Sequence, residues 1–388
     1  MEERIITLNI PDDLINLITK AKYVSFDIFD TAILRIVQTP EDIFTLMDKY
    51  MKINGNKLPF DFRKARIESE KKARKVAWNN SGSVEITIDD IYKCLCEDFN
   101  VDHNTAETLK KMEIDTEINA CVRNEFIYSI YKYCLYKNKD AIFLSDMYLP
   151  EKVIEKILKK CDYNKFKKLY ISSVHIATKS NGGLYELMLK ELDCRPEEIL
   201  HIGDNHESDI TMAKTYGIIT YHYDKCIKRA SKAEKLYHNS EINNSSIEES
   251  IYNAMVSNKF FSSTINNNLT VDEFWYRFGY KYAGILFLGF NMWLCEKAKK
   301  DNVEKLFFLS RDGYIMKTVY DTLLSSVENA PTSEYMYASR RSLNIPGITK
   351  LDDKSIDFLV SGTSTLRVEQ FLKRIGLDPD DYIFAIRD

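Results

Sequence analysis

Four short apolar runs, each ending in polar or acidic residues, punctuate the first part of the chain. They are Tyr23–Asp27, Ala141–Asp146, Lys168–Ser173 and Glu198–Asp204. Continuous apolar runs of this length predict strands that are buried on both faces. Amphipathic helix patterns, Glu151–Lys160 and Gly183–Leu192, lie between the later runs. This alternation predicts an α/β fold with a doubly wound, Rossmann-like parallel sheet, whose strands carry their polar ends to one edge.

A long stretch of different character separates the first apolar run from the second. Its helix patterns lie near Glu41–Met51, Asp61–Ala77, Thr87–Phe99 and Thr105–Val122, and we find no convincing strand among them. An ordinary connection between a strand and a helix is far shorter. We therefore predict a helical cap, at about 36–137, inserted into a core made of 1–35 and 138–235.

Beyond the first domain, 1–235, the composition turns to Ser and Asn, and we interpret 236–270 as a linker that includes one helix pattern. A second α/β domain is predicted for 271–388, with its elements at Asp272–Lys300, Leu306–Ser310, Asp312–Leu324 and Glu334–Ser339. We expect the tyrosines and tryptophans of the helix from Phe274 to Trp293 to lie in its core. Few strands are visible, so we expect this domain to be incomplete.

Length and composition exclude several classes of protein. A chain of 388 residues favours two domains, and a net charge of -4 gives no general attraction for nucleic acid or an anionic membrane. The most apolar run, Tyr282–Leu294, is shorter than the roughly 20 residues of a membrane span, so a buried helix is expected. Eight scattered cysteines without a CxxC pair, and no apolar signal segment, favour a cytoplasmic protein with reduced thiols.

Candidate chemistry follows the strand ends in a fixed order. The residues are Asp27, Phe29, Asp30 and Thr31 after the first run, then Ser145 and Asp146, then Lys179, then Asp204 and Asp209. This order resembles the four motifs of the haloacid dehalogenase superfamily, over about residues 20–225. The resemblance implies that Asp27 is the nucleophile, that Ser145 and Lys179 bind the transferring group, and that acidic residues of the last motif hold Mg²⁺.

Attack by a carboxylate on a phosphoryl group requires the same kinds of side chain. A carboxylate attacks a phosphoryl group only when their repulsion is screened, and Asp27, Asp204 and Asp209 are oxygen donors for the hard cation that screens it. Asp209 has an alternative role, which is to orient a metal-bound water or Lys179. The Lys179 ammonium would offset the remaining negative charge. The Ser145 hydroxyl, the Asp146 amide and the Thr31 hydroxyl are further donors for substrate oxygens.

One position departs from the phosphatases of the superfamily. They carry an acidic general acid/base two residues beyond the nucleophile, where this chain has Phe29. The Phe29 carbonyl can still be a Mg²⁺ ligand, but its side chain cannot move a proton. Three explanations stay open: Asp30 acts as the acid, the leaving group is a phosphoanhydride or a halide that needs no proton, or activity has been lost.

The sequence around these motifs is similar to that of a bacterial subgroup of the superfamily. Members of this subgroup often accompany glycosyltransferases in surface-polysaccharide loci. The similar segments are Ser25–Arg35, Leu144–Pro150, Lys179–Tyr185, His201–Asp209, Phe308–Tyr314 and Tyr337–Leu343. The resemblance implies a small phosphorylated substrate, such as a sugar phosphate or nucleotide sugar, and association with glycosyltransferase machinery. The alternative is a non-catalytic or weakly active phosphosugar-binding module attached to a glycan-processing domain.

Two arginine groups have both a functional and a structural explanation. Arg63, Arg66 and Arg74 repeat along one cap helix, where they either meet an anionic substrate or form a solvated face. In the second domain, four charged residues that follow the predicted strands would form a further anion site. Alternatively, one of them only caps a helix. The four residues are Arg311, Asp312, Arg340 and Arg341.

Overall fold

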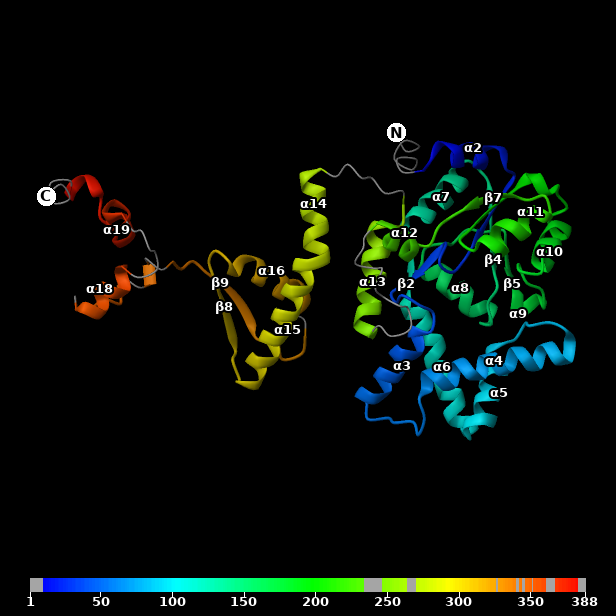
Figure 1. The fold of residues 1–388 in the computed structure, drawn as a ribbon, viewed down its shortest axis with the longest axis horizontal. Coiled ribbons are helices and arrows are strands. Elements are labelled where there is room, and N and C mark those ends of the chain that lie inside the picture. The colour runs from blue at the N-terminus through cyan, green and yellow to red at the C-terminus, as the bar shows by residue number, and fades with distance from the viewer. Residues whose placement is uncertain are drawn as a thin grey trace. The chain divides into compact units, whose positions relative to one another are not determined.

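The computed structural model divides into two compact units, Met1–Asn267 and Asn268–Asp388 (Figure 1). It describes residues 10–233, 246–263, 270–325, 327–339, 342–343, 346–350, 352–360 and 367–382. Within these ranges, no helix combines the length and the apolar character needed to cross a membrane.

A five-stranded parallel sheet forms the centre of the first unit. Its strand order is β5-β4-β1-β6-β7, and the strands are β1 (Tyr23–Asp27), β4 (Asp140–Ser145), β5 (Lys168–Ile171), β6 (Ile199–Gly203) and β7 (Ile219–His222). Every residue of β1 and β6 is buried. The predicted α/β fold with a doubly wound parallel sheet is confirmed. Strand β7 was not predicted, because its short sequence, ITYH, is only half-buried and lacks a continuous apolar run.

Alternate residues of the central strands enter two separate cores, one on each face of the sheet. Val24 and Phe26 of β1 pack in the larger core, whereas Tyr23 packs in the smaller one. Helix α8 buries Ile154, Ile157 and Leu158 in the larger core, at the spacing of one helix face. Helices α10 (Gly183–Leu192) and α11 (Ala213–Thr215) bury residues in the smaller core. The other helices around the sheet are α2 (Asp12–Lys20), α7 (Glu125–Tyr136), α8 (Glu151–Lys160), α9 (Ser172–His175) and α12 (Cys226–Ala233).

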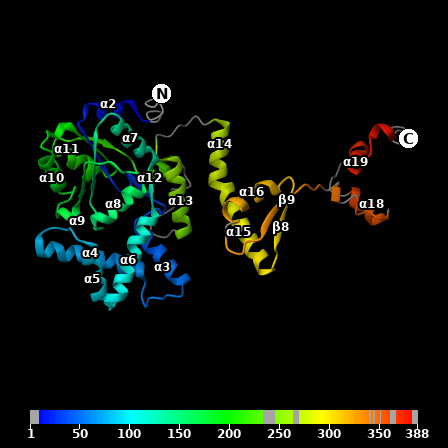
Figure 2. The ribbon, with the colours of Figure 1, turned by 180° about the vertical axis from the view of Figure 1, so that it is seen from behind.

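Four helices of the insertion gather on one side of the first unit (Figures 1 and 2). They are α3 (Asp42–Ile53), α4 (Phe62–Ser81), α5 (Ile88–Phe99) and α6 (His103–Ala120). Two short antiparallel strands, β2 (Ile33–Arg35) and β3 (Cys121–Arg123), enclose this segment. The expectation that no strand interrupts the insertion is wrong, since three-residue strands are too short to show a sequence pattern.

Two helices lie differently from the predicted domain ranges. Helix α7 falls inside the range predicted as cap, yet it packs against β4 of the sheet. Helix α13 (Ile247–Phe260) falls inside the predicted linker and packs against α12 and α3. Its Ser250 hydroxyl donates to the Asp42 carboxylate at 2.7 Å, which ties it to the first unit.

The second unit contains a two-stranded parallel sheet joined by one helix. Its elements are α14 (Val271–Phe278), the π-helical turn η4 (Gly279–Ala283), α15 (Gly284–Lys300), β8 (Lys305–Leu309), α16 (Gly313–Leu323), β9 (Thr332–Met336), α18 (Asp353–Val360), α19 (Val368–Ile375) and η5 (Pro379–Tyr382). The predicted burial of the tyrosines and tryptophans of the aromatic helix is wrong, because Trp275, Tyr276 and Trp293 are 60%, 55% and 57% exposed. Two described strands offer too little surface to cover it.

Candidate active site

The carboxyl ends of neighbouring strands bring the predicted site residues to one edge of the first unit's sheet. Asp27 is the last residue of β1 and Ser145 the last of β4, while Asp204 directly follows β6. Asp209 comes from η2 (His206–Met212), a π-helical turn behind β6. Lys179 lies in the loop between α9 and α10. These segments are distant in sequence and meet because parallel strands end together.

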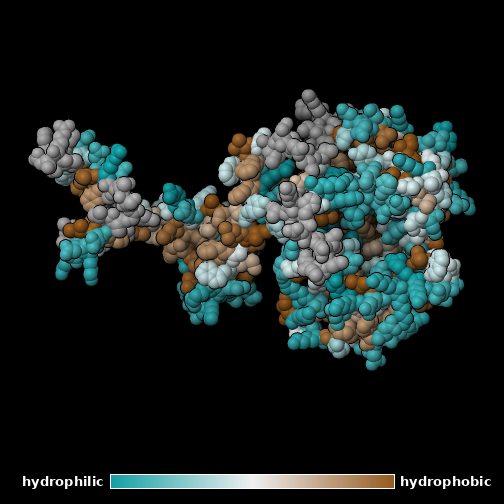
Figure 3. Space-filling model, in the orientation of Figure 1, coloured by the Kyte–Doolittle hydropathy of each residue, from teal (hydrophilic) through white to brown (hydrophobic). Residues whose placement is uncertain are grey.

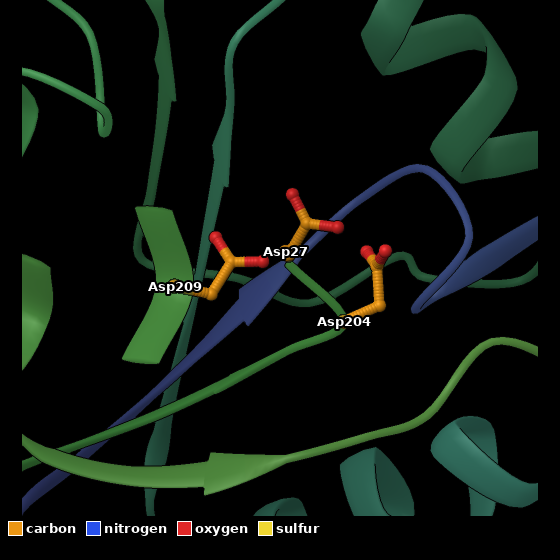
Figure 4. A group of neighbouring side chains, drawn as sticks. All are labelled: Asp27, Asp204 and Asp209. Carbon is orange, nitrogen blue, oxygen red and sulfur yellow. The ribbon is translucent and has the colours of Figure 1, made fainter. Parts of the chain in front are cut away.

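Three carboxylates form the centre of this edge. One oxygen from each of Asp27, Asp204 and Asp209 lies within 4.8 Å of the others, and Figure 4 shows the three side chains facing a common space. Asp27 and Asp209 are buried and Asp204 is half-buried. Gly203 permits this approach, since a Cβ there would lie 2.4 Å from the Asp209 carboxyl carbon. Negative groups at this spacing repel one another unless a cation lies nearby.

Lys179 supplies one such cation from within the protein. Its buried ammonium donates to Asp27, and to Asp209 Oδ1 at 2.6 Å. Burial lowers the pKa of Lys179, but the charges of Asp209 and Asp27 outweigh burial and hold it above its usual value. The Asp146 carboxylate accepts from the Lys179 backbone N–H at 2.7 Å, so it fixes the loop that carries the ammonium.

Asp27 and Asp209 have different surroundings although they share Lys179. Asp209 also accepts from the Asn205 backbone N–H at 3.0 Å and lies 3.4 Å from His201 Nε2. Burial raises the pKa of Asp209, yet Lys179 and His201 bring it below its usual value. Among the described residues, the Asp27 carboxylate has only Lys179 as a hydrogen-bond donor, and burial holds the pKa of Asp27 well above its usual value.

His201 is a site residue that the sequence reasoning missed. It is fully buried on β6, with Nδ1 2.8 Å from the Ser25 hydroxyl and Nε2 facing Asp209. Burial lowers the pKa of His201 below its usual value, which favours the neutral ring. A histidine inside the apolar run ILHIG was the available signal, because a buried ring nitrogen needs a partner.

Asp30 and Thr31 follow β1 and lie near Asp204. Asp30 has a left-handed backbone, with φ of 61°, and its carboxylate accepts from Lys225 Nζ at 2.7 Å. Lys225 also lies 3.3 Å from Asp204. The buried Thr31 hydroxyl donates to Asp204 Oδ1 at 3.1 Å. The structure therefore places Thr31 as a support for Asp204, and nothing in the sequence around Lys225 indicated its role.

A pocket of about 610 Å³ opens above these groups. Phe29, Phe44 and Tyr148 contribute aromatic rings to its lining. The Arg35 guanidinium lies 4.3 Å from the centre of the Phe29 ring and donates to Glu117 at 2.7 Å. Phe29 therefore shapes the pocket with its ring, where the superfamily's phosphatases have a proton donor.

The cap arginines do not form the row over the site that one sequence interpretation proposed. Arg66 is fully buried, and its guanidinium donates to both oxygens of Glu113, at 2.8 and 2.7 Å. Tyr92 and Tyr148 donate their hydroxyls to the same carboxylate. A substrate contact is wrong for Arg66, which instead holds the cap helices α4, α5 and α6 together.

The arginine site predicted in the second unit is not assembled among the described residues. The side chains of Arg311 and Asp312 are 95% and 98% exposed. Arg340 and Arg341 lie outside the described residues.

Comparison with known proteins points to one superfamily. Residues 176–248 match a family model described as HAD-hydrolase-like, where HAD stands for haloacid dehalogenase. No match was found among curated protein sequences. The matched segment begins just before Lys179 and includes Asp204 and Asp209.

Three solved structures illustrate what the chain resembles. A 2-haloacid dehalogenase from Pseudomonas syringae pv. Tomato shares 16% identity, covering 52% of this chain and 86% of its own, with a TM-score of 0.39. A haloacid dehalogenase-like hydrolase from Xanthomonas campestris shares 12%, covering 53% and 82%, with a TM-score of 0.38. A HAD family enzyme from Bacteroides thetaiotaomicron, solved with magnesium and inorganic phosphate, shares 14%, covering 53% and 95%, with a TM-score of 0.37.

These three likenesses are too distant to support an inference about activity, and none bears on the predicted association with glycosyltransferases. The family-model match agrees with the motif order along the chain. Residues 176–248 of the chain are therefore similar to hydrolases of the haloacid dehalogenase superfamily.

Proposed function

We propose that the first unit is a Mg²⁺-dependent phosphohydrolase that uses Asp27 as its nucleophile. One observation carries the proposal: three carboxylates from separate segments meet within 4.8 Å, and a buried ammonium donates to two of them. A cluster of like charges buried at a strand edge destabilises the fold, so its presence favours a functional role. Nucleophilic attack on a phosphoryl group is the use that fits these residue types.

The charge of the cluster suits a divalent cation. Among the described residues, the four carboxylates of Asp27, Asp30, Asp204 and Asp209 contact two ammonium groups, those of Lys179 and Lys225. When all four carboxylates are ionised, an excess of two negative charges is left. Carboxylate oxygens are the ligands that Mg²⁺ prefers. When bound, the ion would screen the repulsion between the nucleophile and the phosphoryl group.

We assign Asp27, Asp204 and the Phe29 backbone carbonyl to the metal, together with Asp209. The hydrogen bonds of Asp209 support a second role for it, because both of its oxygens already face donors and one of these donors is Lys179. It therefore also positions the ammonium. Thr31 positions Asp204 in the same way, through its hydroxyl.

The chain's own groups then account for the two chemical steps. Asp27 attacks phosphorus and the leaving-group oxygen departs; water next attacks the aspartyl phosphate and frees phosphate and the Asp27 carboxylate. The Lys179 ammonium offsets charge on the phosphoryl oxygens. The Ser145 hydroxyl, at the pocket wall, and the Asp146 amide donate hydrogen bonds to the same oxygens.

The surroundings of Asp30 support a substrate with a good leaving group. The Asp30 carboxylate accepts a hydrogen bond from Lys225 Nζ at 2.7 Å, so an ion pair occupies the group that would otherwise serve as the acid. Because the Phe29 side chain has no proton to donate, the departing oxygen must be stable as an anion. Aryl phosphates and phosphoanhydrides meet this requirement. Phosphate esters of acidic hydroxyl groups, including such hydroxyls on activated sugars, meet it as well.

The proposal is tested with the purified protein, Mg²⁺ and an aryl phosphate. Phosphate release should require Mg²⁺ and should fall by about 10³-fold or more in Asp27→Asn, since the covalent route is removed. Asp312→Asn is the matched control, because Asp312 also follows a strand but is exposed in the second unit. Unchanged turnover in Asp27→Asn, with the fold retained, would show that Asp27 is not the nucleophile.

A binding module without chemistry is the second candidate, and the missing acid at Phe29 is the observation that favours it. An aluminium- or beryllium-fluoride adduct on Asp27, formed with Mg²⁺, would support the enzyme. Tight binding of a sugar phosphate by the wild type, with neither an adduct nor turnover, would support the module.

A further inference from the structure

We propose that the substrate is a phosphate ester whose leaving group carries no second negative charge and presents a flat apolar or aromatic face. This inference rests on the proposed function and narrows its substrate class. It is drawn from the charges and rings that line the pocket beyond the reacting groups.

Acidic residues dominate the pocket lining. Eight lining residues are acidic and three are basic. Four of the acids belong to the cluster described above, and Asp146 holds the Lys179 loop. The other three line the pocket just before α3 (Glu41), on α4 (Glu70) and on η2 (Glu207).

Each of the three basic lining residues already contacts a carboxylate. Lys179 contacts Asp27 and Asp209, and Lys225 contacts Asp30 and Asp204. Arg35 contacts Glu117, which is itself buried. Among the described lining residues, none offers an unpaired positive charge to a second phosphate or a carboxylate on the leaving group. The Arg35–Glu117 pair is neutral as a whole, so the N–H groups that Arg35 has left suit a hydroxyl or carbonyl oxygen.

The outer acids differ in how far they are neutralised. Glu70 accepts from Arg66 and Arg74, on its own helix. The Glu41 side chain, which lines the pocket at the start of α3, has no ion-pair or hydrogen-bond partner among the described residues. Glu207 is exposed, with only His206 at 3.8 Å. Glu41 and Glu207 are therefore the residues that would repel a second anionic group.

The aromatic rings define the shape of the leaving group. Phe29, Phe44 and Tyr148 line the same pocket, and the last two also flank the buried Arg66 guanidinium, at 4.7 and 5.0 Å. Those contacts hold the two rings in place, and because Phe44 is only 4% exposed, the partly exposed Phe29 and Tyr148 offer the apolar surface. An aryl group, or the apolar face of an uncharged sugar ring, can pack against them.

The decisive comparison uses two substrates of nearly equal size and leaving-group reactivity. They are para-(carbamoylmethyl)phenyl phosphate, whose substituent is neutral, and para-(carboxymethyl)phenyl phosphate, whose substituent is negative. With Mg²⁺ present, we expect kcat/KM to be higher for the neutral ester by about tenfold or more, because like charges would meet in the pocket. The methylene group keeps the substituent's charge from altering the phenol.

A charge-removal variant identifies the residues responsible. The double variant Glu41→Gln, Glu207→Gln should reduce the gap in kcat/KM between the neutral and the negative ester at least about threefold. The reduction should come mainly from a higher kcat/KM for the negative ester. Glu68→Gln is the matched control, since Glu68 is an exposed acid of cap helix α4 outside the pocket lining, and it should leave the gap unchanged.

The possible failures are distinguishable. If Mg²⁺ supports turnover and the negative ester is hydrolysed as well as the neutral one or better, this inference is overturned while the proposed function stands. A gap that the double variant leaves unchanged would overturn the assignment to Glu41 and Glu207. If neither ester is turned over, the proposed function fails and the inference falls with it.

Discussion

The two units contain the same local pattern with different results. In each, an apolar strand is followed directly by a polar or acidic segment: Asp27 ends β1, and Arg311 and Asp312 come soon after β8. In the first unit, β1 lies between four other strands, all five of its residues are buried, and its acid meets Lys179. In the second, β8 pairs only with β9, and Arg311 and Asp312 are almost fully exposed.

Surface character follows the same division. Figure 3 shows apolar side chains gathered over α15 and the β8–β9 sheet, whereas polar side chains cover most of the first unit's visible face. Phe307 of β8 is 55% exposed, and Phe26 of β1 is fully buried. A strand-end motif therefore becomes a site only where neighbouring strands and covering helices bury the strand that carries it. Burial makes the charged groups at the strand end interact strongly.

The largest difference is expected between two lysines that each pair with acids. Lys179→Met should lower phosphate release by about 10²–10³-fold, since a buried donor to the reacting groups is lost. It should also lower the free energy of unfolding by about 3–5 kcal/mol without Mg²⁺, because it leaves Asp27 and Asp209 buried without their cation. Added Mg²⁺ should recover part of this stability.

Lys317→Met is the matched variant in the second unit, where Lys317 pairs with a half-exposed Asp321. It should change stability by about 1 kcal/mol or less and leave turnover intact. Urea unfolding and phosphate release measure both effects. Equal losses for the two lysines would contradict the contrast between the units.

The strand phenylalanines test packing without charge. Phe26→Ala should cost about 3–5 kcal/mol, because it opens a cavity in the core of the first unit. Phe307→Ala should cost about 1 kcal/mol or less, since the ring is already more than half in water. Hydrogen exchange of peptides from β1 and β8 during urea unfolding reports each unit separately. A large cost at Phe307 would mean that this strand is covered in solution.

A third test adds to the first unit the acid that it lacks. Phe29→Asp should raise kcat/KM for an alkyl phosphate by about tenfold or more, because a proton donor would serve a poor leaving group. Aryl phosphate turnover should change little, so the ratio of the two rates is the measurement. The control is Phe29→Asn, which has the same shape without a proton to give. An equal gain in both variants would show that removing the ring, and not adding an acid, caused it.

The smallest expected effect concerns the aromatic helix of the second unit. An apolar fluorescent dye should bind the native protein, and the double variant Trp275→Ser, Trp293→Ser should reduce its fluorescence about twofold, because exposed rings offer an apolar surface. Phosphate release should be unaffected. Dye binding that is insensitive to both tryptophans would place the apolar surface elsewhere.

The sequence by itself determined the central strands and the acids at their ends. The apolar runs predicted β1, β4, β5 and β6 to within a few residues, and α8 and α10 at their observed bounds. Strands buried on both faces must be continuously apolar, so their positions are visible in one dimension. The motif order then predicted which polar residues would share an edge, because parallel strands end together.

Tertiary structure alone decided the partners of these groups. Arg66 finds Glu113 across 47 residues, and Lys225 finds Asp30 across 195. No periodicity encodes such pairs, because they depend on the course of every intervening loop. Likewise, the aromatic pattern of α14 and α15 predicted burial, but burial needs a second surface, and the described part of the second unit does not supply one. A sequence shows which side chains favour leaving water, and only the assembled fold decides whether they do.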